Sequence, residues 1–171
     1  MKRLLKIVLI VGFTFVLTNC EKDDICDPNL TTTPRVIIEF YSIQNPSVLL
    51  PVTNLSVIAP EFTGLTEPEP MTFTNTSKIE LPLKTFQDTT TFEFTINSTA
   101  TNGTNNTDVV VFNYTRRDIY VSRACGFKTY YDLSGDTGIV IQTDANNWIK
   151  NKTIVNTQIE SENDVHIKLF Y

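Results

Sequence analysis

The sequence has few of the residues from which common catalytic and phosphate-binding motifs are built. Its 171 residues include one histidine, six glycines and three cysteines. The glycines form neither G-x-G-x-x-G nor G-x-x-x-x-G-K, so the chain has no phosphate-binding loop of these types. A nucleophile–base pair built on His166 would need a Ser or Cys beside it, and no Gly-x-Ser-x-Gly segment occurs. We expect a non-enzymatic protein without a cofactor, with His166 exposed on the polar side of the last strand.

The apolar run near the N-terminus is too short to cross a membrane. Residues 7–17 read IVLIVGFTFVL and follow the basic residues Lys2, Arg3 and Lys6. A membrane-spanning helix needs about 20 apolar residues, whereas a secretory signal combines a basic start with a short apolar core. We therefore predict a signal peptide over residues 1–19.

The chain also lacks an excess of positive charge. Residues 20–171 contain 11 Lys and Arg against 19 Asp and Glu, a formal charge of −8. Such a balance repels phosphate backbones, which argues against nucleic-acid binding. It also provides no polybasic patch, so membrane attachment would have to come from acyl chains.

The three cysteines have separate predicted roles. Leu17-Thr18-Asn19-Cys20 resembles a bacterial lipobox, in which the cysteine is acylated and becomes the first residue of the mature protein. Cys26 and Cys125 would then remain as an even pair in an oxidising compartment, where such pairs usually bond. The alternative is ordinary signal cleavage, which leaves Cys20 available for a disulfide, for example with Cys26. Two thiols alone make a poor metal site.

Apolar residues alternate with polar ones along most of the chain after residue 20, as expected for strands. Alternation is clear in residues 78–83, 91–98 and 164–169, and more continuous apolar runs occupy 35–43, 54–59, 108–114 and 138–142. Residues 101–106 and 134–138 carry turn residues, and 115–118 (Thr-Arg-Arg-Asp) also reads as a turn before a strand at 119–122.

This pattern predicts an all-β fold. We expect an antiparallel β-sandwich of about 8–10 strands over residues 33–171, compatible with an immunoglobulin-like topology, and a small β-barrel is the alternative. Residues 20–32 would form a lipidated tether between the signal peptide and this single domain.

Several segments together resemble a family of small flavobacterial (Bacteroidetes) lipoproteins of unknown function. They include Asp-Asp-Ile-Cys, which ends at Cys26, and Ser-Arg-Ala-Cys-Gly, which contains Cys125. Lys22-Asp23-Asp24 resembles the acidic signal that exports lipoproteins of that group to the cell surface, although a solvated tether has the same composition. Asp88-Thr89-Thr90 resembles an O-glycosylation acceptor of such bacteria, with Thr89 as the modified residue. The resemblance implies an outer-membrane lipoprotein, more often on the cell surface than on the periplasmic face.

The remaining candidate residues are aromatic or acidic. Phe127, Tyr130, Tyr131 and Trp148 would form a platform for a glycan or peptide if exposed, or fill the core if buried. Asp132 and Asp136 could serve as the carboxylate pair of a glycosidase, but they flank a turn and we expect ordinary turn chemistry. The segment at Asp144 lacks the spacing of a calcium loop, so we expect no metal site. The leading hypothesis is an accessory or interaction module with a protein or glycan partner. A carbohydrate- or peptide-binding lipoprotein is the alternative, and a hydrolase is third.

Overall fold

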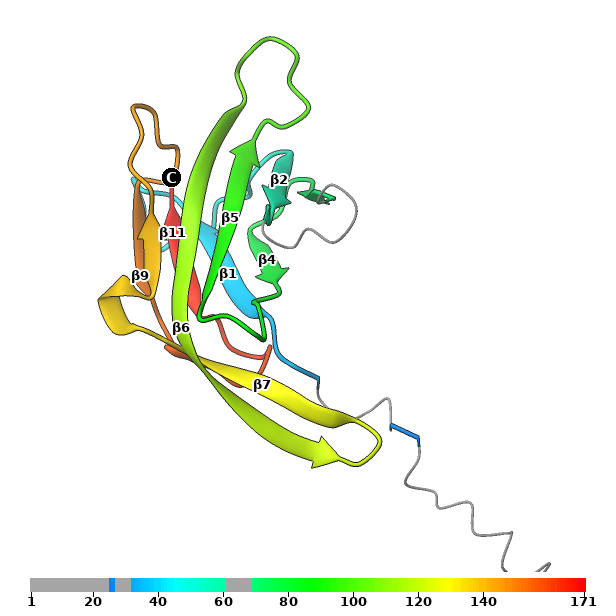
Figure 1. The fold of residues 1–171 in the computed structure, drawn as a ribbon. Coiled ribbons are helices and arrows are strands. Elements are labelled where there is room, and N and C mark those ends of the chain that lie inside the picture. The colour runs from blue at the N-terminus through cyan, green and yellow to red at the C-terminus, as the bar shows by residue number, and fades with distance from the viewer. Residues whose placement is uncertain (1–24, 27–31, 61–68) are drawn as a thin grey trace, which may run out of the picture. The chain divides into compact units, whose positions relative to one another are not determined.

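The computed structural model describes residues 25–26, 32–60 and 69–171 (Figure 1). Eleven strands occur in this part of the chain, with one short 3₁₀ turn, η2 (Gly135–Thr137), and no α-helix. Their bounds are β1 Val36–Tyr41, β2 Leu55–Ile58, β3 Met71–Phe73, β4 Lys78–Leu81, β5 Thr89–Ile96, β6 Asn106–Ser122, β7 Gly126–Leu133, β8 Ile139–Ile141, β9 Asn151–Ile154, β10 Gln158–Ile159 and β11 Ile167–Phe170.

The strands form two sheets. One has four strands in the order β4-β1-β11-β9, and the other has seven, with the path β10-β7-β6-β5-β2-β3 and β8 paired with β6. Nearly all pairings are antiparallel, but β1 and β11 run parallel, with Ile38 opposite Ile167 and Phe40 opposite Leu169. The two sheets do not close into the small barrel that was the alternative expectation, so the predicted all-β sandwich is confirmed.

The core is built from the alternate residues of strands in both sheets. In β5, buried Phe92 and Phe94 alternate with less buried neighbours, as period-two strands require. They belong to one apolar cluster that also contains Phe40 of β1 and Phe112 of β6. Because removal of apolar surface from water is the dominant favourable term in folding, this cluster is the main source of the fold's stability.

Strand β6 is longer than the sequence pattern predicts. Residues Thr115–Asp118 continue the strand instead of forming the expected turn. Both arginines of this segment have acidic partners: Arg116 Nε donates to Asp88 at 2.7 Å, and Arg117 donates to Glu160 at 2.5 Å. Consecutive polar residues in a solvent-exposed part of a strand have the same composition as a turn, so the prediction of a turn at residues 115–118 was wrong.

The described residues divide into two compact units. One comprises Thr32–Ile119 with Thr129–Tyr171 and contains the sandwich core. The other comprises Tyr120–Lys128 together with Met1–Thr31, of which the structure describes only Ile25 and Cys26. The second unit therefore contains the turn between β6 and β7 and one cysteine from the N-terminal segment.

Candidate functional site

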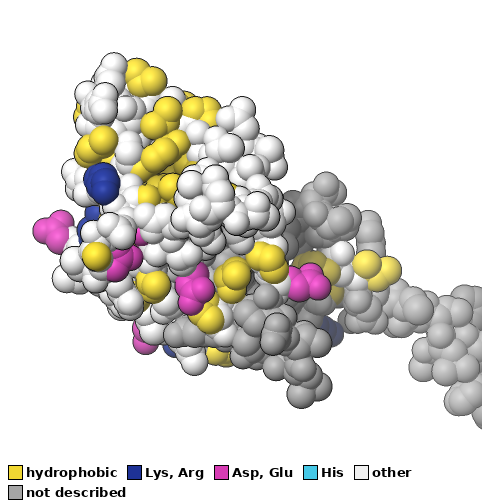
Figure 2. Space-filling view, turned by 90° about the horizontal axis from the view of Figure 1, so that it is seen from above, with side chains coloured by type: hydrophobic (Ala, Val, Ile, Leu, Met, Phe, Trp, Pro, Cys, Tyr) yellow, Lys and Arg dark blue, Asp and Glu magenta, His cyan; other side chains and the backbone are white. Residues whose placement is uncertain are grey.

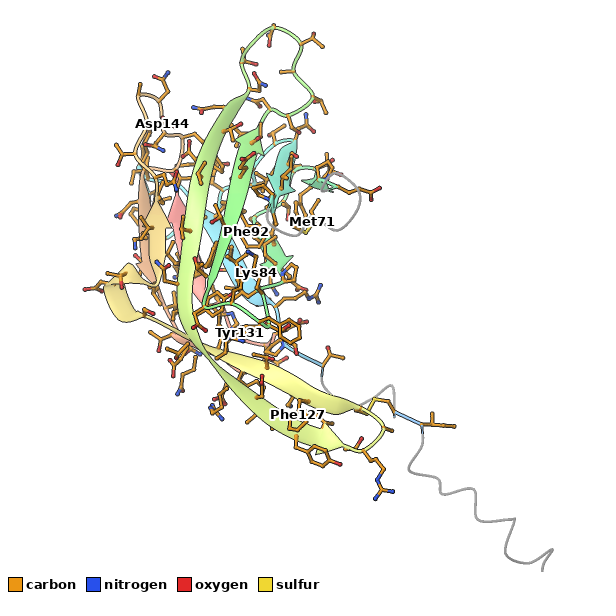
Figure 3. All side chains as sticks on the ribbon, in the orientation of Figure 1. Met71, Lys84, Phe92, Phe127, Tyr131 and Asp144 are labelled. Atoms are coloured by element: carbon orange, nitrogen blue, oxygen red, sulfur yellow. A yellow bond between two sulfur atoms is a disulfide. The ribbon has the colours of Figure 1, made fainter. Side chains whose placement is uncertain are left out.

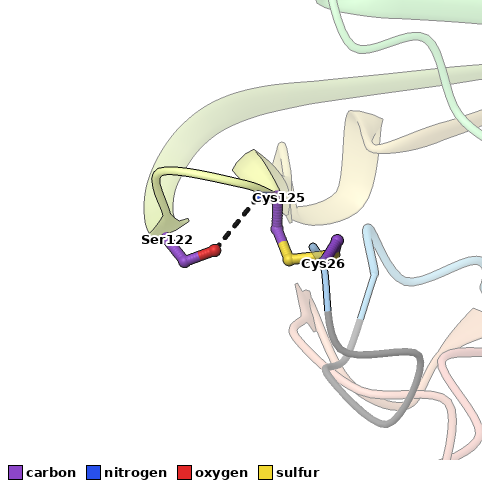
Figure 4. Close-up of a disulfide and its surroundings, with 3 residues drawn as sticks. All are labelled: Cys26, Ser122 and Cys125. Atoms are coloured by element: carbon purple, nitrogen blue, oxygen red, sulfur yellow. Dashed lines mark hydrogen bonds between the residues drawn. A yellow bond between two sulfur atoms is a disulfide. The ribbon is translucent and has the colours of Figure 1, made fainter. Parts of the chain in front are cut away.

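A disulfide joins the β6–β7 turn to the N-terminal segment (Figure 4). Cys26 and Cys125 are bonded across 99 positions of sequence, with their Cα atoms 4.8 Å apart. This separation lies within the usual range for a disulfide. The structure confirms the predicted Cys26–Cys125 pair over a Cys20–Cys26 bridge.

The sequence Ser-Arg-Ala-Cys-Gly explains the local shape of this turn. The Cys125 N–H donates to Ser122 Oγ at 3.0 Å, which satisfies a turn donor with a short polar side chain. Gly126 follows with φ of +70°, in the left-handed region that glycine adopts without strain. Apart from Gly126 itself and its two chain neighbours, no atom lies within 4 Å of the position that a Cβ would take there, so the backbone angle and not crowding favours glycine.

Apolar side chains are exposed around this disulfide. The rings of Tyr120 and Phe127 meet edge to face, with centroids 5.4 Å apart. Even so, Tyr120 is 60% and Phe127 68% exposed, and Ile25, beside Cys26, is 82% exposed. Large apolar groups are usually buried, so three in one small unit suggest a contact surface.

The four aromatic residues predicted as a platform do not form one exposed face. Phe127 is exposed and Tyr131 lies in the core, at separate places along β7 (Figure 3). Tyr130 is partly buried with Arg117 over its ring, and Trp148 lies in the core. Phe127, Tyr130 and Tyr131 all belong to β7, and alternation along a strand sends neighbouring side chains to opposite faces. The platform is therefore corrected: Tyr131 and Trp148 cannot stack on a ligand.

Both buried aromatics have structural partners for their polar atoms. Tyr131 Oη donates to the Leu83 carbonyl at 3.0 Å, and burial raises the pKa of this phenol well above its usual range. Trp148 Nε1 donates to the Phe94 carbonyl at 3.0 Å. A hydrogen-bonded polar atom is what allows a large aromatic side chain to be fully enclosed.

His166 is also buried, contrary to the expectation of an exposed strand residue. The imidazole Nδ1 accepts the Ile37 backbone N–H at 2.9 Å, and the backbone N–H of His166 donates to the Ile37 carbonyl at 3.1 Å. Burial lowers the pKa of the imidazole, and nearby Asp164 offsets this in part. The neutral ring thus serves as an acceptor for a backbone donor that the β1 ladder leaves unpaired.

Asp108 is a buried carboxylate that sequence reasoning did not identify. Its two oxygens accept the N–H groups of Trp148 and Ile149, at 3.1 and 2.7 Å. Burial raises the pKa of this carboxyl, while the two backbone hydrogen bonds act in the opposite direction. The sequence does contain a signal for this residue: Asp108 is an acid in the run Asp-Val-Val-Val-Phe, at a position that alternation places inward.

The other predicted residues are placed as follows. Thr89 is exposed at the start of β5, and its neighbour Thr90 is buried and hydrogen-bonded to Tyr114. Asp144 Oδ1 accepts the Asn146 N–H in a local turn. Cys20, Lys22, Asp23 and Asp24 lie outside the described residues. Within the described ranges, no three His, Cys, Asp or Glu residues are grouped to hold a metal ion.

A polar hollow of about 390 Å³ lies beside the β5–β6 loop. Its lining is Asn54, Asn97, residues 99–102 and Thr104. These groups bond to one another: Asn54 Nδ2 donates to Thr99 Oγ1 at 3.1 Å, and Asn97 Nδ2 donates to the Thr104 carbonyl at 3.3 Å. On the face shown in Figure 2, apolar side chains lie among uncharged polar ones and a few acidic and basic ones. The hollow carries no charged or aromatic group.

The fold and the disulfide-linked turn define a two-sheet, all-β domain. The sequence model of the family of unknown function DUF6452 matches residues 56–171, more than half of the chain. The chain belongs to this family. No curated protein and no solved structure matched it. We find no helix in the described ranges that is long and apolar enough to span a bilayer.

Proposed function

We propose that this protein is an exported lipoprotein held at the outer membrane by acyl chains on Cys20. The observation that carries the proposal is the Cys26–Cys125 disulfide, because it uses two of the three cysteines. Cys20 is then the single cysteine left, and it follows the basic and apolar segment of residues 1–19. A disulfide is also expected of an exported protein, since oxidising compartments allow these bonds to persist.

The β-sandwich acts by contact, as an accessory or interaction module, and not as a catalyst. In support, the two titratable side chains His166 and Asp108, which are buried, accept hydrogen bonds from the backbone. His166 accepts a backbone N–H of β1, and Asp108 accepts two backbone N–H groups. Catalytic acids and bases instead need to reach a substrate.

The domain faces the outside of the cell in this proposal. The support is the resemblance of Lys22-Asp23-Asp24 to the acidic surface-export signal of Bacteroidetes lipoproteins. Replacing all three residues with alanine should leave the protein in the membrane fraction but protect it from protease added to intact cells. Unchanged protease sensitivity would show that this segment is only a tether.

Binding of a glycan or peptide is the second candidate function. The observation that favours it is the exposed Tyr120–Phe127 pair, since exposed aromatic rings can stack on sugars or anchor an interface. Burial of Tyr131 and Trp148 leaves this candidate a smaller aromatic surface than the sequence implied.

Metabolic labelling tests the anchor. A Bacteroidetes host that expresses the full chain is fed an alkyne analogue of palmitate, and the immunoprecipitated protein is examined for label. We expect label on the wild type and on a Cys26→Ser/Cys125→Ser variant, and none on Cys20→Ser. Label that persists in Cys20→Ser, or is absent from the wild type, would contradict the proposal. Crosslinking of the labelled protein in membranes, followed by affinity capture, then identifies its contact partner.

A further inference from the structure

We propose that the β6–β7 turn, residues Tyr120–Lys128 with Ile25, is a second membrane contact that inserts its apolar side chains among lipid headgroups. The inference rests on the proposed acylation of Cys20. Six steps of chain separate Cys20 from Cys26, which span about 20 Å even when fully extended. The disulfide ties Cys26 to Cys125, with 4.8 Å between their Cα atoms. The turn is therefore held within a short distance of the bilayer surface by two covalent links.

The side chains of this unit suit the interface between water and lipid. Tyr120 and Phe127 are in contact with each other and remain mostly exposed, and Ile25 is exposed beside the disulfide. Aromatic side chains gather at membrane interfaces, where an apolar ring meets lipid and a polar tip such as the Tyr120 hydroxyl stays hydrated. Close to a bilayer, these groups would leave water without needing a protein partner.

Within the β6–β7 turn itself the charged residues are basic, whereas the segment around Ile25 is acidic, with Asp23, Asp24 and Asp27. Residues 119–131 contain Arg123 and Lys128 and no acidic residue, although residues 20–171 as a whole carry a formal charge of −8. Anionic headgroups attract basic residues close to the surface. Two basic residues are too few to anchor a protein, so the acyl chains remain the anchor, and the turn adds a second point that restrains how the unit rotates about it.

Tryptophan fluorescence with brominated lipids tests this contact. Trp148 is the one native tryptophan and is 6% exposed, so it provides a constant background. Phe127→Trp places a reporter in the turn, and Tyr120→Trp is a second reporter if the first variant folds poorly. Phe86→Trp is the matched control, since Phe86 is an aromatic residue that is 90% exposed outside this unit. Each mature lipoprotein is purified from membranes and reconstituted in vesicles of phosphatidylethanolamine and phosphatidylglycerol.

We expect brominated lipid to quench the added emission of Phe127→Trp and of Tyr120→Trp, with a shift to shorter wavelength, and to leave Phe86→Trp unchanged. Equal quenching of all three variants would overturn the proposed membrane contact of the turn. The same conclusion would follow from no quenching in a protein that floats with the vesicles and whose acylation is confirmed by mass spectrometry, and neither result would contradict acylation of Cys20. A missing lipid modification would instead overturn the proposed function. Emission of Phe127→Trp that responds to a soluble polysaccharide and not to brominated lipid would assign the turn to glycan binding and contradict the membrane contact.

Discussion

Replacing both Cys26 and Cys125 with serine should lower the free energy of unfolding by about 2–5 kcal/mol. The bond closes a loop of 99 positions, and a loop of this size removes roughly 4–5 kcal/mol of conformational freedom from the unfolded chain in the chain-entropy treatment. The folded state should survive the change. Strand β1 begins ten residues after Cys26 and is hydrogen-bonded between β4 and β11.

Urea denaturation at pH 7, followed by the fluorescence of Trp148, measures this loss. The indole reports on the core because it contacts the rings of Phe40 and Tyr171. Wild type treated with a reductant should unfold at the same urea concentration as the double variant. Cys20→Ser is the matched control and should behave as the oxidised wild type, because Cys20 is outside the bridge. A loss below about 1 kcal/mol in the double variant, or an equal loss in Cys20→Ser, would show that the Cys26–Cys125 bridge does not stabilise the fold in this way.

Three further predictions concern buried or paired titratable groups. Asp108→Ala should cost about 2–4 kcal/mol in urea denaturation, because two buried N–H groups lose their acceptor, whereas the exposed Asp132→Ala should change stability by less than about 0.5 kcal/mol. Arg35 lowers the pKa of Glu162 from 4.5 to about 2. This ion pair should therefore stabilise the fold above pH 4.5, and its contribution should be lost as the pH falls toward 2. In thermal unfolding at different pH values, Glu162→Gln should remove that part of the acid dependence. Burial lowers the pKa of His166, so the folded protein favours the neutral ring and stability should decline as the pH falls below about 6.5. His166→Asn keeps a hydrogen-bond acceptor but does not titrate, so it should flatten that decline. An unchanged pH profile in this variant would contradict the prediction.

The sequence pattern predicts the fold class well because burial follows alternation. Phe92, Phe94, Ile167 and Leu169 are inward as their spacing indicates, and the turn predicted at residues 101–106 falls at the loop between β5 and β6, although Asn106 already begins β6. Strand pairing is different. The parallel contact of β1 with β11 joins the two ends of the domain, and no local pattern encodes a partner more than a hundred residues away.

The candidate site was predicted in part. The disulfide followed from cysteine arithmetic, but the exposure of single aromatic residues did not. Tyr131 and Phe127 lie four positions apart in β7 and share a residue class, yet one is 2% and the other 68% exposed. Their burial depends on whether the core cluster extends to their part of the strand, which only the three-dimensional arrangement shows. His166 was likewise misjudged, because its partner, the Ile37 N–H, lies 129 positions away.

Mass spectrometry of the mature protein under non-reducing conditions tests the central claim most directly. Protease digestion of protein purified from membranes gives the N-terminal peptide and the disulfide-linked peptides in one measurement. We predict that Cys20 is the first residue and carries acyl chains, and that the peptide of Cys26 is bonded to that of Cys125. An unmodified Cys20, or a Cys20–Cys26 disulfide with Cys125 free, would contradict it.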